Sequence, residues 1–591
     1  MYILWRMIYN VYIYMVNIVN AIAKFIINKK ITILIVIFIV SFWIPIENHS
    51  QDSLIITTKP RALELNINGP IVDEDPYDIR IYQQKVYPSF NMNSMYTIAN
   101  IINKAKSDST ISCILMNLHN FTGADQTCLE YVGKYLKDFS SCKPIYVYSC
   151  NYDQERYYLA SYATQINLER FSEIDLHGLT ESHIYFNRLL RIFRLVPYIF
   201  RVGIYKSATE PFTRDNMSKE DKIASLSVIQ QRWNRFIETI ANNRHTSVQD
   251  IFPTNIRNKL NELKMLGDSS QYALNHHMVD NICSEYEFKE NLKSIVGMDE
   301  SNQHLNIINM FDYITPENVS VEDNNTNIDI ISINFLINRG AKLDNICHKM
   351  NELISKKNIK VVILCMNSPG GDFFSSLKIR ELVILLKKSG KKIVVSMGNA
   401  ATSGAYLIAS AADYIIANPI SMTGSIGAFN IINNFSKILN FLGIHRDGVS
   451  ISPLHSIAPE EPLTPEQKEM LEIILENNYK HFVQMIAESR NKTFDQINNI
   501  AQGRIWTGKD AMDNGLIDSL GDLDDAIAKA IELGNITDSH VAWCVNYNTS
   551  NIFQPRRVVY DNSGESNDFA RSLLDTFKSI SNSLNLVSNS D

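Results

Sequence analysis

Apolar runs of strand length alternate with amphipathic runs of helix length from about residue 60 to about residue 545. Ile111–Asn117 and Val361–Met366 are apolar at nearly every position, which is typical of strands buried on both faces of a parallel sheet. Helical periodicity follows these runs at Cys128–Phe139 and Phe373–Lys388. This βαβ alternation predicts an α/β protein whose parallel sheets are covered by helices. The same pattern predicts strands at Ala62–Ile67, Pro144–Ser149, Gln165–Leu168, Ile328–Phe335, Ile393–Ser396 and Tyr414–Ala417, and helices at Thr97–Ala105, Arg156–Ala163, Leu343–Ser355 and Ser403–Ala411.

The order of elements in the first half of this pattern recurs in the second half. Asn117-Leu-His-Asn-Phe-Thr-Gly and Asn367-Ser-Pro-Gly-Gly each follow a buried strand, and Tyr158-Leu-Ala-Ser-Tyr-Ala corresponds to Tyr406-Leu-Ile-Ala-Ser-Ala. A period of about 250 residues indicates two copies of one domain rather than a solenoid. We therefore expect one domain at 55–315 and a second at 328–545, joined by the polar segment 315–327.

The amino-terminal region contains an uncharged, strongly apolar run at residues 31–46. Lys29 and Lys30 precede it and Glu47 follows it, so the run predicts a transmembrane anchor that leaves residues 1–30 in the cytoplasm or on the membrane surface. The alternatives are a cleaved signal peptide and a buried core helix, but no small-x-small cleavage site follows the run. At the other end, residues 546–591 form a polar tail with one short helix expected near Phe569–Leu586.

The charge and the cysteine content narrow the classes of function. A formal net charge of −7 indicates no basic surface for nucleic acid. The eight cysteines show neither CxxC nor metal-ligand spacing, so no metal and no cofactor are expected. Cys113, Cys150 and Cys365 lie in apolar, strand-like runs, where we expect them to be buried as small hydrophobic residues.

The segment 391–412 contains a candidate nucleophile. A strand is expected to end at Ser396, a turn of small residues follows, and a helix begins near Ser403. A hydroxyl at that position lies at the positive end of a helix dipole, where the amide of Gly404 can stabilise a developing oxyanion. A second amide can come from the turn Asn367-Ser-Pro-Gly-Gly-Asp, at Gly371 or, as the alternative, at Gly370. The alternatives are a helix-capping role for Ser403 and an ordinary turn at Pro-Gly-Gly.

A serine nucleophile requires a general base. His445 and His455 lie in polar loop sequence, and no acidic partner is placed to orient them. Lys206 follows an apolar strand, beside Ile204 and Tyr205, and a lysine becomes a base where desolvation or neighbouring groups favour its neutral form. Most lysines are solvated surface charges, so these residues alone make Lys206 one candidate base and no more.

Several long segments resemble bacterial signal peptide peptidases of the protease IV type, in their long two-domain form. They include 201–218 (RVGIYKSATEPFTRDNMS), 367–372 (NSPGGD), 396–419 (SMGNAATSGAYLIASAADYIIANP), 422–429 (MTGSIGAF) and 500–527. These motifs are long and unusual, and the resemblance extends from the apolar run to about residue 545. It implies two tandem ClpP/crotonase-like βα superhelix domains with an amino-terminal transmembrane anchor.

The resemblance also implies a serine protease whose active site is divided between the two halves. Each half carries one member of a Ser/Lys dyad. The first-half position that matches the nucleophile is Glu155, and the second-half segment that matches the surroundings of Lys206, 449–454 (VSISPL), contains no lysine. The implied roles are nucleophile for Ser403, general base for Lys206, oxyanion hole for Gly404 and Gly371, and orientation of the lysine for Ser425.

From the resemblance we expect an enzyme that degrades cleaved signal peptides and misfolded exported proteins. It implies a homo-oligomer, a tetramer in this family, at the outer face of the bacterial cytoplasmic membrane. The chain would cross the membrane once, with its amino terminus in the cytoplasm and its catalytic domains in the periplasm. Substrate peptides would bind as extended strands between the Pro-Gly-Gly turn and the strand after the nucleophile.

Three positions depart from the family pattern, and two other functions were weighed. Thr402, Ala405 and Asp372 stand where alanine, glycine and serine are usual. A crotonase-like acyl-CoA enzyme shares the fold, but its chemistry needs acidic bases near the oxyanion hole. A catalytically inactive membrane-anchored scaffold is the second alternative, and the retention of both dyad members argues against it.

Overall fold

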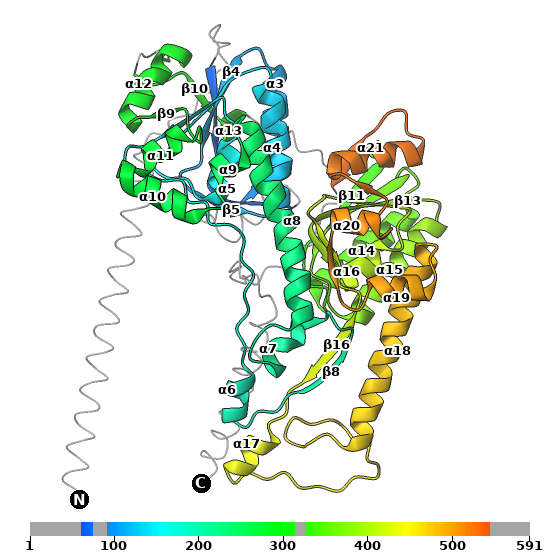
Figure 1. The fold of residues 1–591 in the computed structure, drawn as a ribbon. Helices are drawn as coiled ribbons and strands as arrows, with labels where there is room; N and C mark the ends of the chain where they lie inside the picture. The colour runs from blue at the N-terminus through cyan, green and yellow to red at the C-terminus, as the bar shows by residue number, and fades with distance from the viewer. Residues whose placement is uncertain (1–60, 75–91, 300, 302, 314–324, 544–591) are drawn as a thin grey trace, which may run out of the picture. The chain divides into compact units, whose positions relative to one another are not determined.

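Two mostly parallel sheets carry the fold, one in each half of the chain (Figure 1). The computed structural model describes residues 61–74, 92–299, 301, 303–313 and 325–543, which belong to one unit of the chain. The predicted anchor at 31–46, most of the expected linker and the tail lie outside the described residues. Among the helices that are described, none is both long enough and apolar enough to cross a membrane.

The sheet of the first half contains six strands in the order β10-β1-β4-β6-β7-β9, and all of its neighbours are parallel. Its central strand β4 is Ile111–Asn117, whose apolar side chains are buried on both faces. Helices pack against both faces of such a sheet, which is why its strands are apolar throughout. The other strands are β1 (Arg61–Asn66), β6 (Ile145–Ser149), β7 (Gln165–Leu168), β9 (Asn281–Ile282) and β10 (Ile307–Asn309). A smaller sheet contains β2 (Gly69–Val72), β3 (Asn93–Ser94) and β5 (Phe121–Ala124).

The sheet of the second half contains eight strands, and only the pair β15–β17 is antiparallel. Its main path runs β17-β15-β13-β12-β11-β19; off this path β14 pairs with β13, and β18 pairs with β14. The strands are β11 (Ile328–Ile333), β12 (Val361–Ser368), β13 (Lys392–Thr402), β14 (Tyr414–Ala417), β15 (Met422–Gly424), β17 (Ile505–Thr507), β18 (Ser519–Leu520) and β19 (Val541–Trp543).

Helices cover each sheet and bury a separate apolar core in each half. The helices of the first half are α3 (Met95–Ser107), α4 (Gln126–Ser140), α5 (Gln154–Ala160), α6 (Asn187–Ile192), α7 (Glu210–Thr213), α8 (Lys219–Asn243), α9 (Val248–Ile251), α10 (Ile256–Leu266), α11 (Ser269–Asn275), α12 (Glu285–Val296) and α13 (Met310–Tyr313), with a 3₁₀ turn at Ser207–Thr209. Those of the second half are α14 (Ala341–Ser355), α15 (Phe373–Lys388), α16 (Gly404–Ala409), α17 (Ser436–Phe441), α18 (Pro465–Ser489), α19 (Phe494–Ile500), α20 (Gly508–Asp513) and α21 (Leu523–Gly534). The predicted α/β architecture in two tandem copies is confirmed.

The largest error in a predicted strand end concerns the candidate nucleophile, while the ends predicted at Phe335 and Met366 lie at Ile333 and Ser368. The sequence predicted the end of β13 at Ser396, whereas the strand continues to Thr402. Its last three residues, from Ala400, pair in parallel with β15, beyond a register shift in the pairing of β12 with β13. Small residues were interpreted as a turn because local composition does not show a pairing partner. As a result, Ser403 follows directly after a paired strand.

The cysteine prediction was correct at two of its three positions. Cys113 and Cys365 are buried within their strands, whereas Cys150 is exposed. The strand β6 ends at Ser149, so Cys150 falls in the loop that follows it.

The two halves repeat each other in detail. The helices α8 and α18 both contain 25 residues, and the arginine after each helix binds an aspartate, in the pairs Arg244–Asp280 and Arg490–Asp518. These four residues occupy equivalent places, because each aspartate also accepts a backbone N–H from a strand of its own sheet. The duplication predicted from the sequence is therefore present in the side-chain contacts as well as in the order of elements.

The register of the repeat differs by one residue from the sequence alignment. The hydroxyl of Tyr157 donates to the carbonyl of Met278 at 2.8 Å, and that of Tyr406 donates to the carbonyl of Leu516 at 2.7 Å. Tyr157, and not Tyr158, is thus the counterpart of Tyr406. Three residues earlier, Gln154 rather than Glu155 therefore matches Ser403. The sequence alignment was wrong by one residue because Tyr157 and Tyr158 are adjacent and either can be aligned with Tyr406.

One short antiparallel ladder joins the halves. The strand β8 (Tyr198–Val202) of the first half pairs with β16 (Ala428–Ile432) of the second, with Val202 opposite Ala428. Figure 1 shows the two strands side by side below the second sheet. Because Lys206 lies just beyond β8, this ladder delivers a first-half residue to the second half.

Candidate active site

Ser403 occupies the sharp turn between β13 and α16. Its backbone has φ 53° and ψ −119°, a region that residues with a Cβ rarely adopt and that is common where a site stores strain. Its N–H donates to the carbonyl of Gly424 at 2.8 Å. The Ser403 side chain makes no capping hydrogen bond to the helix. The alternative that Ser403 only caps its helix is therefore wrong.

The amide of Gly404 opens helix α16 at its positive end. The first N–H groups of a helix have no acceptor within the helix, so this amide is available to an anionic group. A Cβ added to Gly404 would lie 3.4 Å from the backbone nitrogen of Gly371. The two amides named by the sequence analysis thus lie next to each other beside Ser403.

The turn at residues 367–372 (NSPGGD), here called the glycine turn, also places the amide of Gly371 beside Ser403. Ile337 bonds to the residues on either side of it: its N–H donates to the Gly370 carbonyl at 2.7 Å, and its carbonyl accepts from Asp372 at 2.8 Å. In a parallel bridge of this kind, the N–H and C=O of the intervening residue point to the opposite side. The N–H of Gly371 therefore faces away from Ile337. A Cβ added to Gly370 would lie 2.9 Å from the Cβ of Ser403, so the turn and the serine are in close contact.

Lys206 is held against the second half by its backbone. The N–H of Tyr205 donates to the carbonyl of Gln502 at 2.8 Å. A Cβ on Gly503 would lie 2.6 Å from the backbone nitrogen of Lys206, and Gly503 has φ 79°. Only glycine allows the two segments to approach so closely. This approach directs the Lys206 side chain toward Ser403.

The ammonium of Lys206 lies between two serines. Its Nζ is 3.4 Å from Ser403 Oγ, 2.9 Å from Ser425 Oγ and 3.1 Å from the Ser425 carbonyl. Lys206 and Ser425 are 7% and 8% exposed, and the ring of Phe429 lies 5.8 Å from Nζ. The structure therefore brings together Ser403, Lys206 and Ser425, with Lys206 and Ser403 separated by 197 positions in the sequence.

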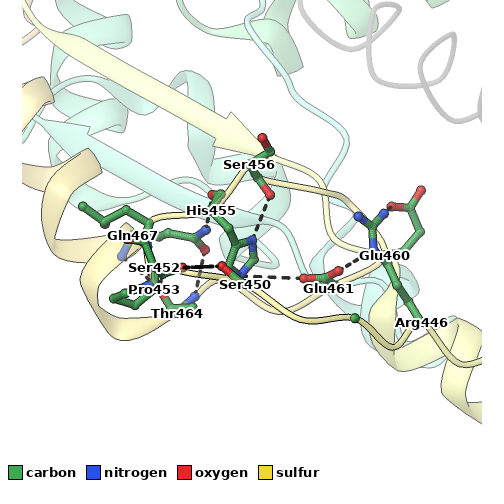
Figure 2. A network of polar contacts seen from close by, with 12 residues as sticks. Arg446, Ser450, Ser452, Pro453, His455, Ser456, Glu460, Glu461, Thr464 and Gln467 are labelled. Atoms are coloured by element: carbon green, nitrogen blue, oxygen red, sulfur yellow. Dashed lines mark hydrogen bonds and ion pairs between the residues drawn. The ribbon is translucent and has the colours of Figure 1, made fainter.

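The two histidines weighed as bases make other contacts. His445 Nδ1 lies 3.0 Å from the side chain of Asn440. His455 contacts the carbonyl of Ser456 and lies 3.9 Å from the carboxylate of Glu461 (Figure 2). Each histidine is thus occupied by a residue close to it in the sequence.

The three departures from the family pattern have different surroundings. Thr402 donates its hydroxyl to the carbonyl of Pro369 at 2.8 Å and so ties the strand end to the glycine turn. Asp372 caps helix α15, where its carboxylate accepts from the N–H of Ser375 at 2.8 Å. Ala405 is fully buried, so its methyl group contributes to the core. The contact of Thr402 was missed by the sequence analysis because it joins the end of β13 to a turn 33 positions away in the sequence.

Buried polar residues of the first half support the strands that carry the site. Arg232 donates to the side chain of Asn399 in β13 at 2.7 Å, and Asp125 is hydrogen-bonded to Asn367, at the start of the glycine turn. Burial raises the pKa of the Asp125 carboxyl and lowers that of the Arg232 guanidinium. Asp73, whose pKa burial raises to about 6, accepts the Tyr96 hydroxyl at 2.5 Å. No sequence pattern pointed to this group, because its members come from distant segments.

The fold and this arrangement define the chain as a serine protease built from two tandem α/β domains. The model of peptidase family S49 matches it twice, at residues 137–293 and 385–537, and that of Clp protease matches residues 326–422. The chain belongs to peptidase family S49.

Curated relatives extend the match over most of the chain. "Protease 4" of Salmonella typhi is 36% identical over 554 residues, which cover 91% of this chain and 88% of that relative. "Protease 4" of Haemophilus influenzae is 32% identical, with 88% and 87% covered. "Serine protease SPPA, chloroplastic" of Arabidopsis thaliana is 26% identical, with 65% of this chain and 57% of that relative covered. The resemblance to protease IV is confirmed.

Proposed function

We propose that Ser403 and Lys206 form the catalytic dyad of a membrane-bound endopeptidase. The observation that carries this proposal is the distance of 3.4 Å between Lys206 Nζ and Ser403 Oγ. A nucleophile and a base within or near hydrogen-bond reach are the geometric requirement for such chemistry, and the distance is often looser without substrate.

In the proposed reaction, the neutral amine of Lys206 takes the hydroxyl proton as Ser403 Oγ attacks the peptide carbonyl. The oxyanion of the tetrahedral intermediate accepts hydrogen bonds from the N–H groups of Gly404 and Gly371. The C–N bond then breaks, and the Lys206 ammonium gives its proton to the leaving amine. A water molecule next attacks the carbonyl carbon of the resulting ester and passes a proton to the neutral Lys206. The bond between that carbon and Ser403 Oγ then breaks, the Lys206 ammonium returns its proton to Ser403 Oγ, and the carboxylic acid product leaves.

Ser425 is proposed as the residue that orients the lysine. Both its hydroxyl and its carbonyl face Nζ, at 2.9 and 3.1 Å. Ser425 itself has φ 51°, and its N–H donates to the Arg504 carbonyl at 2.8 Å. Two fixed acceptors restrict the rotation of a long side chain and keep its nitrogen directed at the nucleophile.

The proposed substrates are apolar signal peptides, together with misfolded exported proteins. The apolar run at 31–46 supports a membrane anchor, and an anchored protease meets peptides left in the bilayer at a high local concentration. From the family resemblance we also propose a homo-oligomer at the outer face of the bacterial cytoplasmic membrane, with the catalytic domains in the periplasm.

The test is hydrolysis of a fluorogenic, apolar signal-core peptide by the full chain in lipid nanodiscs. We expect Ser403→Ala and Lys206→Ala each to lower kcat by roughly 10⁴- to 10⁶-fold, as for other dyads and triads that act as a unit. A polar peptide of equal length, compared in the same assay, tests the substrate class separately from the dyad.

Lys391→Met is the matched control. Lys391 is also a buried lysine, 4% exposed, and burial lowers its pKa, but its Nζ donates to the Ile359 carbonyl at 2.9 Å. This variant is expected to retain activity. Peptide hydrolysis that survives in Lys206→Ala would show that another group activates Ser403.

A further inference from the structure

The ladder between β12 and β13 contains a bulge next to the proposed oxyanion hole. Its pairs Met366–Met397 and Ser368–Ala401 are separated by one residue in β12 and by three residues in β13. Such a bulge changes the direction of a strand and is common beside active sites. The equivalent strands of the first half, β4 and β6, pair without a register shift. The bulge therefore distinguishes the half that contains the nucleophile.

Asn367 is the single residue of β12 within the bulge. Its Oδ1 accepts from the N–H of Ala400, on the opposite strand, at 3.2 Å. The amide group of the same side chain donates to the carboxylate of Asp125, a residue of the first half. Since an asparagine side chain has one acceptor group and one donor group, both of its ends are occupied and its orientation is fixed. This side chain thus connects both strands of the bulge to the first half.

The carboxylate of Asp125 makes this contact instead of capping its own helix. Asp125 occupies the N-cap position of α4, but its side chain makes no capping hydrogen bond, although aspartate is among the preferred capping residues. Its counterpart Asp372 does cap a helix, by accepting from the N–H of Ser375 at 2.8 Å. The first-half carboxylate is therefore directed at the second half.

Two further side chains of the first half contact the β13 side of the bulge. Arg232, in α8, donates to the side chain of Asn399 at 2.7 Å. The carboxylate of Asp73 occupies the space that a Cβ on Gly398 would need. Burial raises the pKa of Asp125, and the Arg232 guanidinium opposes this shift by favouring the charged carboxylate. Both strands of the bulge are therefore in contact with charged side chains of the first half.

We propose that Asp125 is a positioning residue for the oxyanion hole and acts through Asn367. Asn367 lies four residues before Gly371, whose amide is one half of that hole. Ala400, which is held by the Asn367 side chain, lies three residues before Ser403. A shift of the bulge would change the distance between the amide and the nucleophile, and a displacement of about 1 Å can lower a rate by about 10²-fold. This inference rests on the proposed function and gives the first half a second role, besides carrying the general base.

The test compares Asp125→Ala with Asp125→Asn, in the full chain in lipid nanodiscs and with the fluorogenic peptide. Alanine removes the acceptor for the Asn367 amide, whereas asparagine keeps a carbonyl oxygen in its place. Glu130→Ala is the matched control, because Glu130 is also an acid of α4 that accepts from a second-half side chain, that of Asn418, at 3.0 Å. Asn418 follows β14 and lies outside the bulge. Urea midpoints of all variants measure their stability.

We expect Asp125→Ala to lower kcat by about 10²-fold with KM little changed, because the oxyanion forms only in the transition state. Asp125→Asn should retain most of the rate. A peptide boronate, whose tetrahedral adduct with Ser403 places an oxygen beside the two amides, should bind Asp125→Ala more weakly by a similar factor. Glu130→Ala should keep the kcat and the boronate affinity of wild type. Asn367→Ala should match Asp125→Ala, and the double variant should lose no more activity than either.

A wild-type kcat in Asp125→Ala would overturn the inference. An equal loss of kcat in Glu130→Ala would also overturn it, because any contact between the halves would then have the same effect. If Asp125→Ala does not fold, Asn367→Ala decides the question by the same criteria. Ser403→Ala in the same assay separates the two proposals. Activity that survived in Ser403→Ala would refute the proposed function, whereas an inactive Ser403→Ala beside a fully active Asp125→Ala would refute only the role of Asp125.

Discussion

The same strand–turn–helix unit occurs in both halves, and only the second copy has a nucleophile in it. In the second copy Ser403 precedes Gly404, and the glycine turn contributes Gly370 and Gly371. In the first copy the corresponding residues are Gln154, Gly123 and Ala124, since Asp125 and Asp372 occupy the N-cap positions of the equivalent helices α4 and α15. The Gln154 carboxamide, 5% exposed, accepts from the N–H groups of His177 and Gly178 at 2.9 and 2.8 Å. A structural side chain thus fills the place of the nucleophile.

The glycine turn has a similar φ at its first glycine in the two copies, but the backbone differs at the nucleophile: Ser403 has φ 53°, whereas Gln154 is not among the residues with positive φ. Gly123 and Gly370 have φ of 117° and 96°. A Cβ on Gly123 would meet nothing within 4 Å, whereas a Cβ on Gly370 would lie 2.6 Å from the Thr402 carbonyl and 2.8 Å from the Gly404 nitrogen. The comparison shows that a duplicated scaffold can keep its order of elements while only one copy adopts the strained backbone at the helix start and closes around a reacting group.

The largest expected effect comes from transferring the nucleophile between the copies. Ser403→Ala with Gln154→Ser should be as inactive as Ser403→Ala alone, roughly 10⁴- to 10⁶-fold below wild type. The base is directed at the second copy, and Ala124 replaces one glycine of the turn. The measurement is covalent labelling by a serine-reactive phosphonate, mapped by mass spectrometry. Labelling at position 154 would contradict the assignment of a single functional copy.

The next comparison substitutes the equivalent glycines. Gly370→Ala should lower kcat by about 10²- to 10³-fold, because the added methyl group displaces the oxyanion amides. Gly123→Ala serves as the control, with kcat unchanged. Both substitutions place a Cβ at positive φ, which should reduce the free energy of unfolding by about 1 kcal/mol, and Gly370→Ala should reduce it further because its Cβ would lie 2.6 Å from the Thr402 carbonyl. Steady-state kinetics measures the loss of kcat, and denaturant unfolding measures the loss of stability. An equal loss of kcat in both variants would contradict the proposal that a methyl group at Gly370 displaces the oxyanion amides.

A smaller effect is expected at the strand end that precedes the nucleophile. Thr402→Val removes the hydrogen bond to the Pro369 carbonyl, and we expect about a tenfold loss of kcat from about 1.4 kcal/mol. Thr402→Ser keeps the hydroxyl and should restore most of the rate, with KM similar in both variants. A rise of KM with unchanged kcat would indicate that Thr402 contacts substrate instead. In the first copy Asp153 takes this position and caps α5.

Asp73 is expected to affect stability clearly and activity least. Its carboxylate lies against Gly398 of the second half. Burial raises its pKa to about 6, against about 3.9 in an unfolded chain. The native state therefore binds the proton more tightly, and this contribution, about 3 kcal/mol, is present below about pH 4 and is lost as the pH rises through about 6.

Asp73→Asn removes this dependence. Relative to wild type, the variant should gain stability between about pH 4.5 and about pH 7.5, measured as urea midpoints at both values. A parallel change of the two proteins with pH would show that Asp73 does not titrate in this range.

Much of the fold could be predicted because it depends on local patterns. The strands at Ile111–Asn117, Gln165–Leu168 and Tyr414–Ala417 and the helix at Phe373–Lys388 were predicted with the bounds that the structure shows. The errors occurred where pairing partners decide the outcome. The strand β13 extends to Thr402 because β15 lies beside it, and Gln154 replaces Glu155 because Tyr157 is the tyrosine that bonds across the domain.

The sequence by itself determined the α/β class, the duplication and the residue types at the site, since apolar period, glycine turns and long motifs are local properties of the chain. Only the tertiary structure decided that Lys206 Nζ lies 3.4 Å from Ser403 Oγ and that Ser425 presents two acceptors to it. These contacts depend on the β8–β16 ladder and on glycines that let separate segments approach. Separation along the chain carries no information about distance in space, so only the packed structure reveals them.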